Sequence, residues 1–113
     1  MQIVKRGIKS MPYVITNCWY PPHLAQKVAQ KYLDTMQKYP IPSTIKRVVP
    51  AASTSFQNGI KVLNVDEVKQ EDLGDVMDYA GKFMVEFYEI EGFRYEINVY
   101  STISEALKNI GMG

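Results

Sequence analysis

Residues 13–24, YVITNCWYPPHL, change from a strand pattern to a helix pattern at two adjacent prolines. With the two-residue period of a strand, Tyr13–Tyr20 has Tyr13, Ile15, Asn17 and Trp19 on one face and Val14, Thr16, Cys18 and Tyr20 on the other, which predicts a strand. The alternation places Val14 and Cys18 on the side that faces the core. It places Asn17 and Trp19 on the opposite, exposed side. Proline is tolerated in a first helical turn, so the two prolines end the strand and open a helix.

Working outward, the helix pattern from Leu24 to Met36 ends at Pro40, and three strand patterns and a second helix pattern follow. Pro50 favours an edge strand or a bulge, and Asn58-Gly59 is typical of a hairpin turn. The further elements that we expect are a strand from Thr44 or Ile45 through Val49, a strand at Ile60–Val68, a helix at Leu73–Ile90, a strand at Phe93–Tyr100 and a short C-terminal helix behind the capping-box pair Thr102 and Glu105.

The order strand, helix, strand, strand, helix, strand predicts an α+β fold of the ferredoxin-like βαββαβ kind. We expect a four-stranded antiparallel sheet with two helices on one face, plus the short C-terminal helix. Residues 1–11 are interpreted as an N-terminal extension and residues 12–113 as one domain, since 113 residues is a common size for a single domain.

Composition narrows the classes of function. With 13 basic and 12 acidic residues the net charge is +1, which argues against nucleic acid and anionic membranes as partners. The N-terminal residues lack the apolar core of a signal peptide, and no run approaches the roughly 20 apolar residues of a membrane span. Cys18 is the one cysteine, so no internal disulfide forms. We therefore expect a cytoplasmic protein.

Two helices cover one side of such a sheet, and we expect the other side to carry large apolar groups. The residues assigned to it are Asn17, Trp19, Tyr20 or Tyr13, Arg47 and members of the Tyr95–Val99 set. A patch of this size is larger than soluble monomers usually expose. Pairing of two sheets in a homodimer, or in a higher oligomer, would cover it.

Over about residues 12–101 the chain resembles the dimeric α/β-barrel group of the ferredoxin-like folds, which includes small monooxygenases and stress-responsive barrel proteins. The resemblance rests on the βαββαβ order, on the strand ending Asn17-Cys18-Trp19-Tyr20-Pro21, and on the C-terminal segment Ile103–Ile110. It implies a homodimer and a ligand cavity, and oxygenase chemistry without a cofactor as one function.

Four residues are candidates for ligand binding, while the catalytic residues stay unknown. His23, the one histidine, lies at a helix start, where sites often occur; the alternative is an ordinary surface residue. Asn17, Trp19 and Tyr20 are similar to the polar and aromatic linings of cofactor-free monooxygenases, and the alternative is a dimer-interface core. Arg47 suits an anionic ligand if it points into the cavity, but strand arginines more often pair across strands. One histidine without partners at ligand spacing predicts no metal site.

The sequence therefore favours a small-molecule-binding homodimer with a cavity between sheet and helices. A cofactor-independent oxygenase, or a similar small-molecule enzyme, is the more specific version of this prediction. The alternative, from another class, is a non-catalytic regulatory or assembly module that uses the sheet face as a dimer interface.

Overall fold

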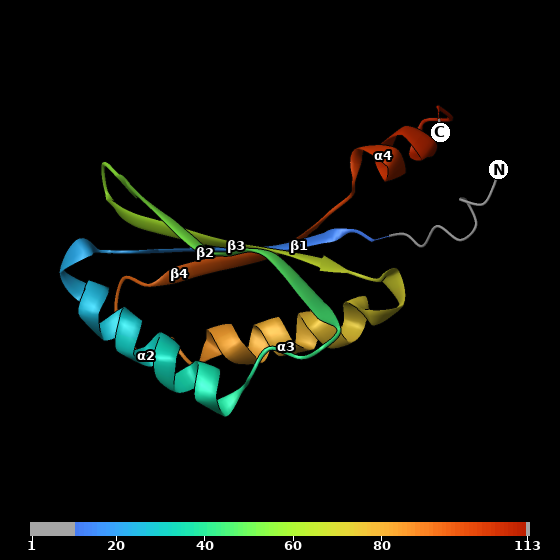
Figure 1. Cartoon of the computed structure of the whole chain (residues 1–113). Coiled ribbons are helices and arrows are strands. Elements are labelled where there is room, and N and C mark those ends of the chain that lie inside the picture. Colours follow the sequence, from blue (N-terminus) through green and yellow to red (C-terminus); the bar gives the residue numbers. More distant parts are fainter. Residues whose placement is uncertain (1–10, 113) are drawn as a thin grey trace.

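The computed structural model describes residues 11–112, so the expected N-terminal extension lies outside the described residues except for Met11. The described residues form four strands and three α-helices in the expected order (Figure 1). Their bounds are β1 Tyr13–Tyr20, η1 Pro22–Leu24, α2 Ala25–Lys38, β2 Ile45–Phe56, β3 Gly59–Val68, η2 Gln70–Asp72, α3 Leu73–Val85, β4 Arg94–Tyr100 and α4 Ile103–Asn109.

The four strands form one antiparallel sheet in the order β2-β3-β1-β4. Helices α2 and α3 lie together against one face of it, and α4 stands on the other side, beyond the end of the sheet (Figure 1). The α+β class and the antiparallel sheet are confirmed, and the arrangement is compatible with a ferredoxin-like fold. Within residues 11–112 no helix is long and apolar enough to cross a membrane.

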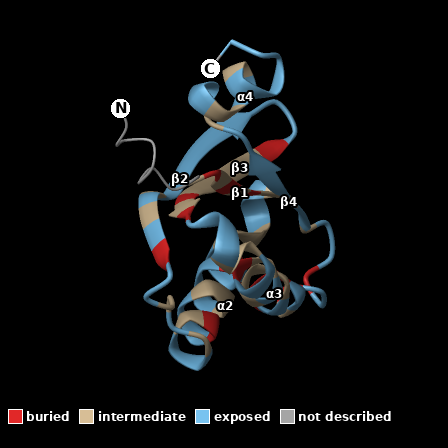
Figure 2. Ribbon diagram, turned by 90° about the vertical axis from the view of Figure 1, so that its right-hand side faces the viewer, coloured by how far each residue is buried: buried red, intermediate tan, exposed pale blue. Residues whose placement is uncertain are grey.

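The core lies between the sheet and the two helices, where the buried segments gather in Figure 2. The alternation of β1 holds, because Val14 is fully buried on the helix side. Two clusters of buried residues make this core. One consists of Val28, Phe83, Met84, Phe87 and Ile90, and the other of Val14, Ile45, Val68 and Val76.

Helix α3 is shorter than the apolar stripe predicted, since it ends at Val85 and not at Ile90. Beyond it the backbone hydrogen bonds span three residues, as in Tyr88 N–H to the Val85 carbonyl and Ile90 N–H to the Phe87 carbonyl. These tighter turns still bury Phe87 and Ile90. The apolar spacing that predicted a helix up to Ile90 therefore continues past the end of α3 at Val85.

Strand β2 is an irregular edge strand, as Pro50 predicted. Its register with β3 shifts between Arg47 and Val49 and again between Val49 and Ala52. Ala51 takes a positive φ of 43°, a conformation that few residues other than glycine adopt. The loop of the hairpin is Gln57-Asn58, and Gly59 begins β3.

The face away from α2 and α3, called the open face below, differs from the expected set. Arg47 pairs with Asp66, which pairs with Val14, so Arg47 lies on the helix side and its assignment to the open face is wrong. The assignment of the odd-numbered residues of β4 to the open face is wrong for the same reason. Tyr95, Ile97 and Val99 pair with the helix-side residues of β1. By register the open face carries Tyr13, Ile15, Asn17 and Trp19 of β1, Lys61, Leu63, Val65 and Glu67 of β3, Arg94, Glu96, Asn98 and Tyr100 of β4, and Lys46, Val49, Ala52, Thr54 and Phe56 of β2.

Candidate functional site

A cavity of about 210 Å³ lies between the sheet and helices α2 and α3, and it is partly open to solvent. Its lining is mostly apolar and aromatic, with a few polar groups among the strands. The lining residues are Thr16, Cys18, Tyr20, Val28, Ala29, Tyr32, Ala51, Ser53, Val62, Asn64, Phe83, Met84, Phe87 and Phe93. Ligand sites are typically concave and apolar with few polar groups, so this cavity is the candidate site.

Short side chains explain why the space exists. Ala29 of α2 and Ala51 and Ser53 of β2 border it, where larger residues would fill it. The bulged part of β2 also departs from regular pairing with β3 at this point. Bulges are frequent beside functional sites because they redirect the strand locally.

Aromatic rings form one wall of the cavity. Phe93 stacks on Tyr20 with centroids 6.2 Å apart and on Phe87 with centroids 4.7 Å apart. Phe83 contacts both Phe87 and Tyr32 through tilted and edge-on geometries. Rings that pack on one another in this way form a rigid apolar surface, suited to a flat partner.

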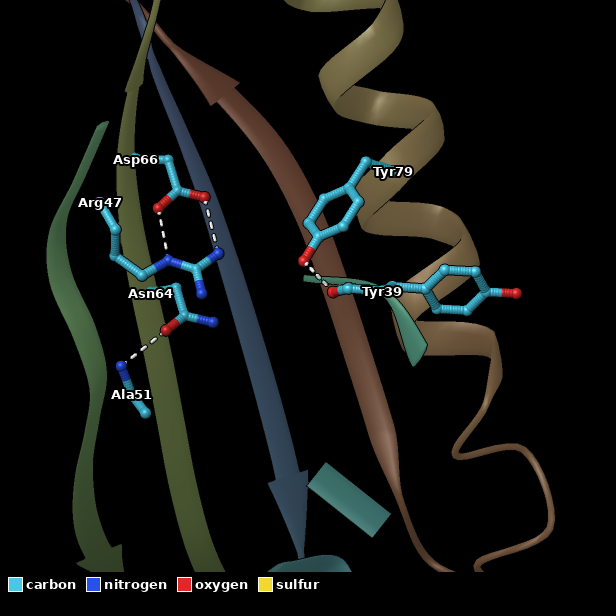
Figure 3. A network of polar contacts seen from close by, with 6 residues as sticks. All are labelled: Tyr39, Arg47, Ala51, Asn64, Asp66 and Tyr79. Carbon is cyan, nitrogen blue, oxygen red and sulfur yellow. Dashed lines mark hydrogen bonds and ion pairs between the residues drawn. The ribbon is translucent and has the colours of Figure 1, made fainter. Parts of the chain in front are cut away.

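Asn64 of β3 supplies a fixed hydrogen-bond donor. Its Oδ1 accepts the backbone N–H of Ala51 at 2.6 Å, and a backbone N–H can only donate. The amide oxygen must therefore face Ala51, and the Nδ2 amino group points toward the side of the helices (Figure 3). No other hydrogen bond of the Asn64 side chain occurs within residues 11–112.

Two titratable groups of the lining, Cys18 and Tyr20, have a raised pKa and stay uncharged near neutrality. Burial raises the pKa of Cys18 to about 11, against a small opposing effect of a hydrogen bond from the backbone of Val62. Burial and the neighbouring Cys18 also raise the pKa of Tyr20. The thiol is therefore a neutral, weak hydrogen-bond partner and a poor nucleophile at pH 7.

Beside the cavity, Arg47 and Asp66 form an ion pair with two hydrogen bonds, Nε to Oδ1 at 2.8 Å and an Nη to Oδ2 at 3.1 Å (Figure 3). Their side chains are 15% and 4% exposed. Burial disfavours the charge on Arg47, but the hydrogen bond and charge of Asp66 outweigh it and raise the pKa of Arg47. Nε and one Nη of Arg47 are therefore already bonded to Asp66. The space left beside this ion pair is only about 20 Å³.

The structure does not bring the four predicted site residues together. Asn17 and Trp19 lie on the open face, where Lys61 and Arg94 stand over the Trp19 ring at 5.7 and 5.5 Å. His23 is exposed in η1. Arg47 is held by Asp66 in the space next to the cavity. None of the four lines the cavity itself.

Asn64 was missed, although the sequence holds a signal for it. In β3, Asn64 and Asp66 alternate with the same side as Val62 and Val68, which faces the helices. Two polar residues inside a core-facing row need partners. Asp66 finds Arg47, and Asn64 finds the bulge at Ala51.

In residues 11–112 no three His, Cys, Asp or Glu side chains cluster as a metal site would require. No family model, curated protein or solved structure matches the chain. The geometry of the cavity and of the open face therefore carries the functional argument.

Proposed function

We propose that the cavity binds a small, uncharged aromatic molecule through an oxygen atom that accepts a hydrogen bond from Nδ2 of Asn64. The orientation of this amide carries the proposal. Ala51 N–H holds the oxygen of Asn64 at 2.6 Å, so the donor is directed before any ligand arrives. Pre-orientation of a binding group lowers the cost of ordering it when a ligand binds.

The size and the charge of the cavity limit the ligand. A volume of about 210 Å³ exceeds that of engineered cavities of roughly 150 Å³ that take up benzene. Cys18 is neutral at pH 7, and Arg47 and Asp66 neutralise each other next to the cavity. A charged ligand would find no counter-ion in the lining, and burying an unpaired charge is costly. A one- or two-ring neutral compound with one acceptor fits these conditions.

The test titrates the protein with two probes of similar shape, acetophenone and isopropylbenzene, and measures their binding from NMR chemical shifts of the protein. We expect both probes to shift signals of Phe83, Phe87 and Phe93, and acetophenone to bind more tightly. Asn64→Asp keeps an oxygen for Ala51 N–H but removes the donor and adds a negative charge that acts on both probes, so acetophenone binding should weaken about tenfold relative to isopropylbenzene binding. Asn17→Asp, on the open face, is the matched control.

Ala29→Phe tests the location of binding independently of the hydrogen bond. The added ring should fill the cavity and abolish binding of both probes while the protein remains folded. Unchanged binding by Ala29→Phe, or shifts confined to the open face, would contradict the proposal. The oxygenase activity that the resemblance implies stays a prediction; of the residues expected for it, Tyr20 lines this cavity and Asn17 and Trp19 do not.

We propose in addition that two copies pair through the open face, which is the assembly role expected from the sequence. What supports it is the row of aliphatic side chains at the centre of that face, with Ile15, Leu63, Val65 and Val49 in neighbouring positions of three strands. Neither α2 nor α3 covers this row (Figure 1). Sheets that pack face to face bury such rows at a spacing of about 10 Å.

A further inference from the structure

Helix α4 presents its apolar side away from its own domain. Ile103 and Leu107 lie on one side of α4 by helical spacing, and Ile110 follows as its C-cap residue. Ile103 and Ile110 are 75% and 69% exposed, while Leu107 is half-buried. The groove between α4 and the rest of the domain is lined on the α4 side by polar residues, namely Ser104, Glu105, Lys108 and Asn109. A surface helix normally has the opposite orientation, with its apolar side against its own core.

The hairpin of β2 and β3 also rises on the open-face side of the sheet. Figure 1 shows this hairpin and α4 at opposite ends of the sheet, both directed away from α2 and α3. Figure 2 agrees that α4 lies across the sheet from these helices. Phe56, the last residue of β2, shares the open face by register and is 39% exposed. The open face is therefore a saddle between two raised ends, each with exposed apolar side chains.

The charges of β3 indicate how two such saddles would fit. Lys61 lies at the hairpin end of the open face and Glu67 at the α4 end, with Leu63 and Val65 between them. A two-fold axis that runs parallel to the sheet, crosses the strands at right angles and passes over Asn64 places Lys61 opposite Glu67 of the other copy. The alternative axis, parallel to the strands, gathers Lys61 and Arg94 of both copies at one end, where like charges repel. Among residues 11–112, Glu67 has one ion pair, a contact of 3.7 Å with the exposed Lys46.

We propose that two copies of this chain pair open face to open face about the axis over Asn64, and that α4 of each packs its apolar side against the β2–β3 hairpin of the other. The axis exchanges the two ends of the saddle, so each α4 meets a hairpin. The contact is made twice and leaves no end uncovered, as in other closed two-fold dimers. The inference rests on the proposed pairing through the open face and assigns its geometry.

The first experiment uses cysteine cross-linking to test whether α4 of one copy lies beside the β2–β3 hairpin of the other. In a Cys18→Ala background, chains with Phe56→Cys are mixed with differently tagged chains that carry Ile103→Cys or Leu107→Cys, and a short bis-maleimide is added. We expect the mixed product to dominate. Ser104→Cys, on the polar side of α4, is the control and should give little. A mixed product no greater than with Ser104→Cys would overturn the α4 contact.

The second experiment tests the axis by charge exchange, with the dimer dissociation constant measured by sedimentation. Lys61→Glu and Glu67→Lys alone each place like charges opposite one another and should weaken pairing roughly tenfold. The double variant restores opposite charges and should recover most of the loss. If the single variants weaken pairing and the double variant does not restore it, the axis is wrong.

The outcomes separate the two proposals. A chain that remains monomeric at about 100 µM contradicts both the pairing and the α4 contact. A dimer that responds to Lys61 and Glu67 but gives no mixed cross-link keeps the pairing and rejects the α4 contact. Ligand binding in the cavity, on the other side of the sheet, is measured independently of either result.

Discussion

At the scale of single residues, the ion pair of Arg47 and Asp66 shows how a polar group is accommodated under the helices. Both side chains lie on the core side of the sheet, where Asp66 is 3% exposed. Two hydrogen bonds join them, which satisfies the carboxylate and neutralises it. Such a pair contributes little compared with apolar residues of the same volume, but either partner alone is strongly unfavourable.

We therefore expect Asp66→Ala to lower the free energy of unfolding by about 3–5 kcal/mol, because it leaves the Arg47 charge buried and unpaired. The double variant Arg47→Met, Asp66→Leu should lose clearly less. Urea unfolding followed by circular dichroism measures both. Lys46→Met breaks the exposed pair with Glu67 and serves as control, with an expected change below about 1 kcal/mol. Equal losses for the single and double variants would contradict this account.

The thiol of Cys18 gives a second prediction at this scale. Its pKa is raised to about 11 by burial, against about 8.5 for an ordinary cysteine. Alkylation by iodoacetamide requires the thiolate. At pH 8 the folded protein should therefore react roughly 100-fold more slowly than the urea-unfolded chain, and its rate should keep rising to about pH 11.

The same shift fixes the sign of a pH effect on stability. Between about pH 8.5 and pH 11 the unfolded chain has lost a thiol proton that the folded protein keeps. The free energy of unfolding should thus decrease as the pH rises through this window. Cys18→Ala lacks this component and should lose less stability over the same range, and identical slopes would show that the thiol does not titrate as described.

At the scale of elements, the geometry of the candidate site depends on the β2–β3 hairpin. The bulge of β2 places the Ala51 N–H against Asn64, and the tight turn that follows brings Gly59 against β1. Gly59 has a φ of 154°, and a Cβ added there would lie 2.5 Å from the backbone oxygen of Tyr20. Glycine at this position is required by close backbone approach, a common reason for glycine within a strand.

We expect Gly59→Ala to lower the free energy of unfolding by roughly 2 kcal/mol or more, because backbone atoms of β1 must move. Gly81→Ala, inside α3, is the matched control, since nothing lies within 4 Å of the added Cβ. That change should raise stability by about 1 kcal/mol through better helix propensity. Chemical denaturation of both variants measures the difference. An unchanged free energy of unfolding in Gly59→Ala would show that β1 and β3 are not this close.

At the scale of the whole molecule, the sheet separates two surfaces with different proposed uses. The helix side holds the aromatic cavity with Asn64, and the open face holds the aliphatic row between α4 and the hairpin. Because successive residues of a strand point to opposite faces, Cys18 serves the first surface while Asn17 and Trp19 serve the second. Variants on one surface are therefore suitable controls for the other.

Much of the fold could be predicted because local patterns report it. Alternation, helical spacing and turn residues predicted the order of the elements, and Pro50 predicted the irregular edge strand. The spacing of Thr102 and Glu105 predicted a capping box, which is present at the start of α4. Each of these features depends on residues within a few positions of one another, so short-range sterics and hydrogen bonds determine it.

The candidate site could not be predicted in this way. Arg47 was assigned to the wrong face because the registry of β2 with β3, and not its own alternation, decides its side. Asn64 becomes a directed donor only because the bulge, thirteen residues away along the chain, offers it the Ala51 N–H. The sequence by itself determined which segments become strands and helices, since that information is local. Only the tertiary structure decided which side chains share a cavity and which side of α4 is exposed, since these depend on registry and packing between segments distant in the chain.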